Sequence, residues 1–257
     1  MKIKILLSAA PFLVFFACTA LAQDAPVLTV QPKTIDIGTF FDGTTVTATG
    51  EIPENGEAIL RFVGTKCDFP MKERGKVFGI MWMNLDSLVF RGVPNVCIIN
   101  SAGELGESKD NSKEEGGIDS LRLGAIEKNA RIEPEGSAHR GMFEEFLKLK
   151  KKEGLYRELS GNVTYGTPSA GHKSFRVEIP VPARLSPGSY QVELAVTANG
   201  KILSQTAQPV MVNLVGFPNL LSNMAFGYPA LYGILSTLIA ILAGLGIGIV
   251  FQSKGAH

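Results

Sequence analysis

The chain has 257 residues, of which 45% are hydrophobic and only 19% are charged, against about 25% in typical soluble domains. Only Lys2, Lys4 and Lys254 among the charged residues fall outside residues 23–201. This distribution excludes intrinsic disorder and a polytopic transporter, and the net charge of +1 excludes a strongly basic nucleic-acid-binding protein.

Residues 1–22 have the pattern of a secretory signal peptide. Lys2 and Lys4 precede an apolar run, and the small residues Ala20 and Ala22 stand at positions −3 and −1 of a cleavage after Ala22. A retained N-terminal membrane anchor is the alternative interpretation. The signal peptide predicts that the body of the protein lies outside the cytoplasmic membrane.

Residues 230–251 are 22 uncharged, mostly apolar residues and predict a transmembrane helix. Such a helix would be about 33 Å long, enough to cross the roughly 30 Å hydrocarbon core of a bilayer. The tail, residues 252–257, has Lys254 as its one fixed charge, so the positive-inside rule places the C-terminus in the cytoplasm. We expect a single-pass membrane protein, with residues 217–229 as a linker to the body.

Small residues recur every four positions in the predicted span, at Ala240, Gly244 and Gly248. This spacing places them on one face of the helix, where small side chains allow a second helix to approach closely. The alternative is that glycine is simply frequent in membrane helices. The pattern predicts contact with another membrane protein or with a second copy of this chain.

The body, residues 23–216, is expected to be mainly β. Residues 34–38 and 44–50 alternate apolar or β-branched residues with polar ones, and Asp42-Gly43 between them predicts a hairpin turn. Residues 77–83 are apolar on both faces, which predicts a central strand covered on both sides.

A turn is expected at Asn84-Leu-Asp86, before the next strand. Residues 175–181 then alternate strictly, and Asn199-Gly200 predicts a type I′ hairpin that pairs the two last strands. Many short strands with turn signals favour an immunoglobulin-like β-sandwich. Tyr190 would be the tyrosine corner of such a domain and Trp82 its core tryptophan, although the usual cysteine two residues after that tyrosine is absent.

Residues 104–158 form a charged insertion with 13 acidic and 11 basic side chains. Its first part predicts an exposed loop. Its second part predicts a helix from Ser137 to about Lys152. The helix carries Phe143, Phe146, Leu147 and Lys150 along one side. The simplest interpretation packs that side on the sandwich and leaves the other lysines in solvent.

Two cysteines, Cys67 and Cys97, remain after the predicted cleavage. An even count in an oxidising compartment permits one disulfide, and two free buried thiols are the alternative. No Cys-x-x-Cys, Walker, Gly-x-Ser-x-Gly or metal-ligand spacing occurs in the chain, so we expect no catalytic residue, cofactor or metal.

Four segments occur in a recognisable order: Trp82-Met-Asn84, Gly154-Leu-Tyr156, Leu185-Ser-Pro-Gly188-Ser-Tyr190 and Pro229-Ala-Leu-Tyr232-Gly233. Together they resemble a family described as "putative transmembrane proteins" and typical of alphaproteobacteria. The resemblance covers nearly all of the mature chain and transfers no catalytic residue. It implies the bacterial inner membrane and a companion of membrane transport or redox systems.

These observations predict a non-enzymatic, membrane-anchored accessory or interaction module in the periplasm. Its expected partners are the lipid bilayer and a membrane protein, or a second copy of the chain, and not nucleic acid. The alternative is a membrane-tethered ligand-binding receptor or enzyme with a site at residues 104–158. That alternative requires a deep pocket with converging polar groups near the insertion.

Overall fold

The computed structural model describes residues 26–104, 117–134 and 141–252. The chain is mainly β, with several sheets, a few helices and one C-terminal apolar helix long enough to cross a membrane. The predicted fold class is confirmed at this level. The predicted signal peptide, Ser137 and residues 253–257 of the tail lie outside the described residues.

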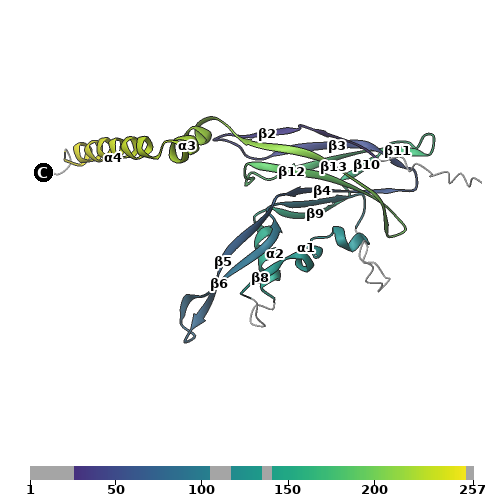
Figure 1. The fold of residues 1–257 in the computed structure, drawn as a ribbon, viewed down its shortest axis with the longest axis horizontal. Coiled ribbons are helices and arrows are strands. Elements are labelled where there is room, and N and C mark those ends of the chain that lie inside the picture. Colours follow the sequence, from purple (N-terminus) through teal and green to yellow (C-terminus); the bar gives the residue numbers. More distant parts are fainter. Residues whose placement is uncertain (1–25, 105–116, 135–140, 253–257) are drawn as a thin grey trace, which may run out of the picture.

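Two sheets form the body of the molecule (Figure 1). The first has the order β1 (Val27–Gln31), β3 (Thr44–Pro53), β11 (His172–Val181) and β10 (Val163–Tyr165). The second has the order β2 (Thr34–Ile37), β13 (Lys201–Leu214), β12 (Gly188–Ala198), β4 (Glu57–Gly64), β7 (Cys97–Ser101) and β9 (Tyr156–Ser160). We call these two sheets the two-sheet body.

One hydrophobic core lies between the two sheets. Val46 and Val177 of the first sheet and Phe62 and Leu194 of the second are fully buried members of the same cluster. The alternation along β11, the first half of β12 and most of β3 directs one face of each strand inward, because successive side chains of a strand point to opposite faces. The hairpin predicted at Asn199-Gly200 is confirmed: both residues have positive φ, and β12 pairs antiparallel with β13.

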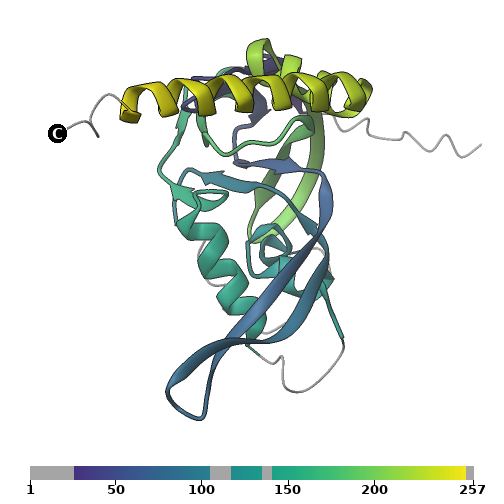
Figure 2. The ribbon, with the colours of Figure 1, turned by 90° about the vertical axis from the view of Figure 1, so that its left-hand side faces the viewer.

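A long β-hairpin leaves the body and forms a separate three-stranded sheet. We call β5 (Lys66–Val77) and β6 (Met81–Pro94) the arm; β8 (Arg131–Glu133) pairs with β6 near its base. Figure 1 shows the arm running away from the two-sheet body, and Figure 2 shows it from the side of the C-terminal helix. Only its base is packed: Leu88 and Phe90 are buried, whereas residues 81–87 are exposed.

The insertion supplies most of the packing on the arm's base. It contains η1 (Ile118–Leu121), α1 (Ala125–Asn129), β8 and α2 (Met142–Lys152). Phe143, Phe146 and Lys150 of α2 are buried, as the helical spacing predicts, and the ring of Phe146 stacks on Phe90 at 4.6 Å between centroids. The last residues of the predicted insertion belong instead to the body, since β9 pairs parallel with β7.

Several local predictions are wrong. The central strand expected at residues 77–83 is the exposed tip of the arm, and the turn expected at Asn84-Leu-Asp86 lies inside the continuous strand β6. Trp82 therefore lies on the surface, with 66% of its area exposed. Asp42-Gly43 does not join a hairpin, because β2 and β3 enter different sheets.

The C-terminal part is helical from Gly216. The predicted linker is almost entirely α3 (Gly216–Gly227), and α4 (Pro229–Gln252) contains the predicted span. An 18-residue window within residues 229–251 has a mean hydropathy of 2.5, and every side chain of residues 229–251 is exposed. Helix α3 follows β13 directly, and α4 follows α3 and contacts it.

Candidate functional site

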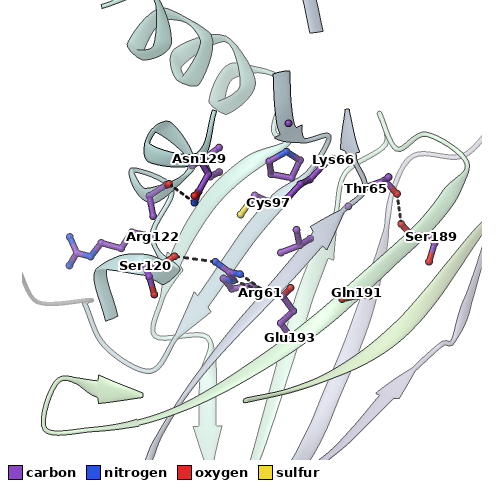
Figure 3. A pocket seen from close by; sticks show the side chains of 16 residues that line it. Arg61, Thr65, Lys66, Cys97, Ser120, Arg122, Asn129, Ser189, Gln191 and Glu193 are labelled. Carbon is purple, nitrogen blue, oxygen red and sulfur yellow. Dashed lines mark hydrogen bonds and ion pairs between the residues drawn. The ribbon is translucent and has the colours of Figure 1, made fainter. Parts of the chain in front are cut away.

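A cleft of about 520 Å³ lies where the second sheet, the arm's base and the insertion meet (Figure 3). It opens on the face of the second sheet that points away from the core. Strands β4 and β12 form its floor, residues 64–66 and 92–94 form one wall, and η1 and α1 form the other. The alternating pattern of β12 accounts for the floor, because Gln191 and Glu193 face opposite to the core residues Val192 and Leu194.

An ion pair crosses the floor of the cleft. Arg61 of β4 and Glu193 of β12 are directly paired in the sheet, and the Arg61 Nε donates a hydrogen bond to Glu193 Oε2 at 2.9 Å. The guanidinium also reaches the backbone carbonyls of Ser120 and Leu121 at 3.5 Å. Arg61 therefore connects the sheet to the first turn of the insertion.

Cationic side chains outnumber anionic ones around the cleft. Arg61, Lys66 and Arg122 line it together with the single carboxylate of Glu193. Figure 3 shows the Arg122 guanidinium pointing away from the centre of the cleft. Its Nε lies 3.6 Å from Asp119 Oδ1, three residues earlier in the chain. Since Glu193 balances Arg61, the remaining positive charge facing the cleft comes from Lys66.

Cys97 contributes a thiol to the cleft from β7 (Figure 3). Burial raises the pKa of this thiol to about 12, against a smaller lowering by the nearby Arg61 guanidinium. The protonated thiol is a poor nucleophile, because thiolate is the reactive form. Within residues 26–104, 117–134 and 141–252, no group of three His, Cys, Asp or Glu side chains could hold a metal ion. The groups described in the cleft are suited to hydrogen bonding and charge pairing.

The predicted site residues fall in separate places. Cys67 lies on β5 at the arm's base, half-buried, and Cys97 lies buried on β7; both thiols are free in the structure. Their pairing as a disulfide stays a prediction. Ala240, Gly244 and Gly248 lie on the exposed helix α4, far along the chain from the cleft.

Sequence reasoning missed the two residues that build the floor. Arg61 interrupts an otherwise apolar strand, and this interruption was the available signal. Glu193 lies on the face of β12 opposite to Tyr190, but its partner could not be identified before the strand order was known. The insertion was expected to flank any pocket, and η1 and α1 do so.

The comparisons with known proteins identify one family. A model described as "Putative transmembrane protein (Alph_Pro_TM)" matches residues 27–253, which include both sheets, the arm, the insertion and both C-terminal helices. Neither the curated proteins nor the solved structures compared with the chain give a match.

Proposed function

Since the chain belongs to the Alph_Pro_TM family of putative transmembrane proteins, we propose that it is an accessory or interaction module of a membrane transport or redox complex. In this proposal α4 crosses the bacterial inner membrane and the β-rich domain lies in the periplasm, with the C-terminus in the cytoplasm. The hydrogen bond of Tyr190 to Ser186 supports an immunoglobulin-like sandwich as the class of the two-sheet body.

The observation that carries the proposal is the exposure and the uncharged composition of α4. Over residues 229–251 every side chain is exposed, and no charged residue interrupts the helix. The length and composition of this helix fit the hydrocarbon core of a bilayer, and its small-residue face allows a second helix to pack closely. The two-sheet body does not cover it, so its lateral surface is available to a partner in the membrane.

The test is purification of the tagged full chain from its own membranes in mild detergent. We expect the wild type to co-purify with a membrane transport or redox protein, and the Gly244→Ile, Gly248→Ile variant to lose that protein, since the added side chains block close helix contact. Leu242→Ile is the matched control, because residue 242 lies about 200° around the helix from residue 240. A wild type that purifies alone, or only with copies of itself, contradicts the accessory role.

The cleft favours a second candidate function, a membrane-tethered receptor for a small anionic ligand. It lies beside the insertion, holds converging polar groups and has a net positive lining. Thermal unfolding of the full chain in detergent, with succinate or inorganic phosphate as probe, tests this candidate, because a ligand that binds only the folded state raises the unfolding midpoint.

The variants for this test are Lys66→Gln and Lys173→Gln. Lys66 lines the cleft, whereas Lys173 lies on β11 over the ring of Tyr165 and serves as the control. We expect the probe to raise the midpoint of the wild type and of Lys173→Gln, and to have less effect on Lys66→Gln. No rise with either probe, or an equal rise in both variants, contradicts binding at the cleft.

A further inference from the structure

We propose that the tip of the arm, residues 78–85, inserts into the surface of the same membrane that α4 crosses, with anionic lipid headgroups as its charged partner. The inference rests on α4 lying in a bilayer and does not depend on a protein partner or on the cleft. Six large apolar side chains lie exposed at this tip: Phe78, Ile80, Met81, Trp82, Met83 and Leu85.

The described part of the chain leaves these side chains uncovered. Strand β8 pairs only with Val89–Arg91 of β6, and α2 packs against Phe69 and Phe90 near the base. Beyond Leu88 the arm is therefore a two-stranded ribbon, in which Phe78 and Ile80 are 91% and 87% exposed. A cluster of exposed apolar side chains in an isolated hairpin marks a surface that contacts something else.

The turn at the tip places an aromatic residue where a small one is usual. Phe78 and Gly79 both have positive φ, 52° and 75°, and the Ile80 amide donates a hydrogen bond to the Val77 carbonyl at 3.4 Å. Asn or Gly is preferred at the first of these positions, because a bulky side chain is strained in the left-handed region. The turn at the outermost point of the arm thus carries an aromatic ring at a position that favours Asn or Gly.

The charges near the tip match an anionic membrane surface. Between residues 72 and 86 three basic residues, Lys72, Arg74 and Lys76, outnumber Glu73 and Asp86, and no carboxylate lies between those two positions at the tip. The Lys76 Nζ lies 5.4 Å from the centroid of the Trp82 ring. Tryptophan beside cationic side chains, behind an apolar tip, is the composition of segments that lie at a membrane interface.

The arm leaves the body at the end that adjoins the membrane anchor. Helix α3 follows β13 directly, and the Val215 amide donates a hydrogen bond to the Ile37 carbonyl, so no spacer separates the body from α3. The arm starts at this same end, since Gly64 pairs with Tyr190 and Gly188 pairs with Val212 near the end of β13.

The tip of the arm and α3 also lie at the same end of the molecule. Figure 1 shows the tip of the arm on the same side of the body as α3 and level with it along the horizontal axis. Figure 2, viewed from that side, shows α3 at one edge and the tip at the opposite edge. The 12 residues of β5 give the arm a length of about 40 Å.

Two further apolar features lie at the α3 edge. Helix α3 has no charged residue and exposes Phe217, Leu220 and Phe226. Phe40, in the segment between β2 and β3, is 95% exposed, and the neighbouring Gly38 approaches Val215. A body resting on the bilayer through α3 and through the arm would be held at two separated points, which restrains its tilt.

Trp82 provides a direct test, because it is the only tryptophan of the chain. The full chain is reconstituted into vesicles of phosphatidylcholine and phosphatidylglycerol at a 7:3 ratio, and the emission of Trp82 is recorded with and without phospholipids brominated on the acyl chains. We expect a blue-shifted emission that the brominated lipids quench. Alkaline carbonate extraction shows independently that α4 is inserted.

Variants locate the contact. Phe78→Ser combined with Ile80→Ser should shift the emission toward that of water-exposed tryptophan and reduce the quenching. Leu203→Ser, which removes an exposed apolar side chain from β13, is the control and should leave both unchanged. Lys76→Gln should reduce the quenching more in vesicles with phosphatidylglycerol than in phosphatidylcholine alone.

Two results would overturn the proposal. An emission typical of water-exposed tryptophan in vesicles from which α4 is not extracted places the tip in solvent. The second result is a blue shift that brominated lipids do not quench, or a blue shift that disappears as the protein is diluted in lipid. Either outcome would mean that the tip contacts a protein surface, which in this preparation is a second copy of the chain. Neither result would affect co-purification of a membrane partner through α4, so the two proposals fail separately.

Discussion

The hydroxyl of Tyr190 donates a hydrogen bond to the backbone carbonyl of Ser186 at 2.7 Å. The same hydroxyl accepts a hydrogen bond from the Asn95 side-chain amide at 3.0 Å, and the ring stacks on Phe62 with centroids 5.2 Å apart. Asn95 lies directly over Gly64, where an added Cβ would meet its Oδ1 at 1.6 Å. Tyr190 thus joins the segment before β12 to the segment between the arm and β7.

The first prediction concerns this hydroxyl. Tyr190→Phe keeps the stacked ring and removes both hydrogen bonds, which leaves the Ser186 carbonyl and the Asn95 amide without that partner. We expect the free energy of unfolding to fall by about 1–2 kcal/mol. Denaturant unfolding of the full chain in detergent, followed by circular dichroism, measures the change. The exposed Tyr228→Phe should unfold like the wild type, and equal stability of the two variants would contradict the role of the hydroxyl.

The second prediction concerns Arg61 and Glu193. The Nε and Nη2 of Arg61 both donate to Glu193 Oε2, and the two side chains are only 23% and 33% exposed, so a double-mutant cycle with Arg61→Met and Glu193→Gln should give a coupling of about 1 kcal/mol. The reference is Arg176 and Glu178, an exposed pair at 3.2 Å, for which the coupling should be close to zero. A coupling close to zero for Arg61 and Glu193 as well would contradict a stabilising ion pair on the floor of the cleft.

The third prediction concerns Lys150, a buried cation on α2. Its Nζ lies 3.8 Å from the centroid of Phe69 and 3.9 Å from Glu153 Oε2. Burial lowers the pKa of Lys150, and the nearby Glu153 opposes this shift. Because the folded state binds this proton less tightly than the unfolded state, folding is penalised at pH values below the lowered pKa. The penalty is relieved as the pH rises from that value toward 10.5.

Lys150→Met removes the charge and keeps the apolar stem. We expect this variant to be at least as stable as the wild type at pH 7, and its advantage to shrink as the pH approaches 10.5. Lys150→Ala also loses the stem and should be less stable than Lys150→Met by about 1–2 kcal/mol. Unfolding midpoints measured between pH 6 and 10 test the sign, and a Met variant whose advantage grows with pH would contradict it.

The fourth prediction concerns the two thiols. Because burial raises the pKa of Cys97 to about 12, this thiol should resist N-ethylmaleimide at pH 7.5 in the folded chain. The half-buried Cys67 should react before it. When the chain is denatured without reductant in the presence of N-ethylmaleimide, peptide mass spectrometry should find Cys97 labelled. If neither cysteine is labelled after denaturation, the two are joined by a disulfide and the free thiols of the structure are contradicted.

The strands with strict alternation could be read from the sequence, because a body with one buried face imposes a period of two on each strand. The hairpin at Asn199-Gly200, the buried side of α2 and the membrane-length helix followed from equally local patterns. Tyr190 could also be assigned, since its hydrogen bond reaches a carbonyl only four residues away. Each of these features depends on residues close together in the chain.

The arm was not predictable in this way. Residues 77–83 are apolar on both faces, and such a pattern indicates only that both faces avoid water. The pattern does not distinguish a strand buried in the protein's own core from an exposed tip whose apolar side chains face a surface outside the protein. The distinction depends on which strands flank the segment, and here only β5 does beyond Leu88.

The sequence by itself determined the β-rich body, the apolar C-terminal helix and the position of the charged insertion, because composition and periodicity record how much of each segment meets water. Only the tertiary structure decided that Arg61 faces Glu193 and that η1 and α1 close a cleft over them. It also decided that the arm leaves the body at the end next to α3. These relationships join residues up to 132 positions apart, and strand order, which no local pattern encodes, brings them together.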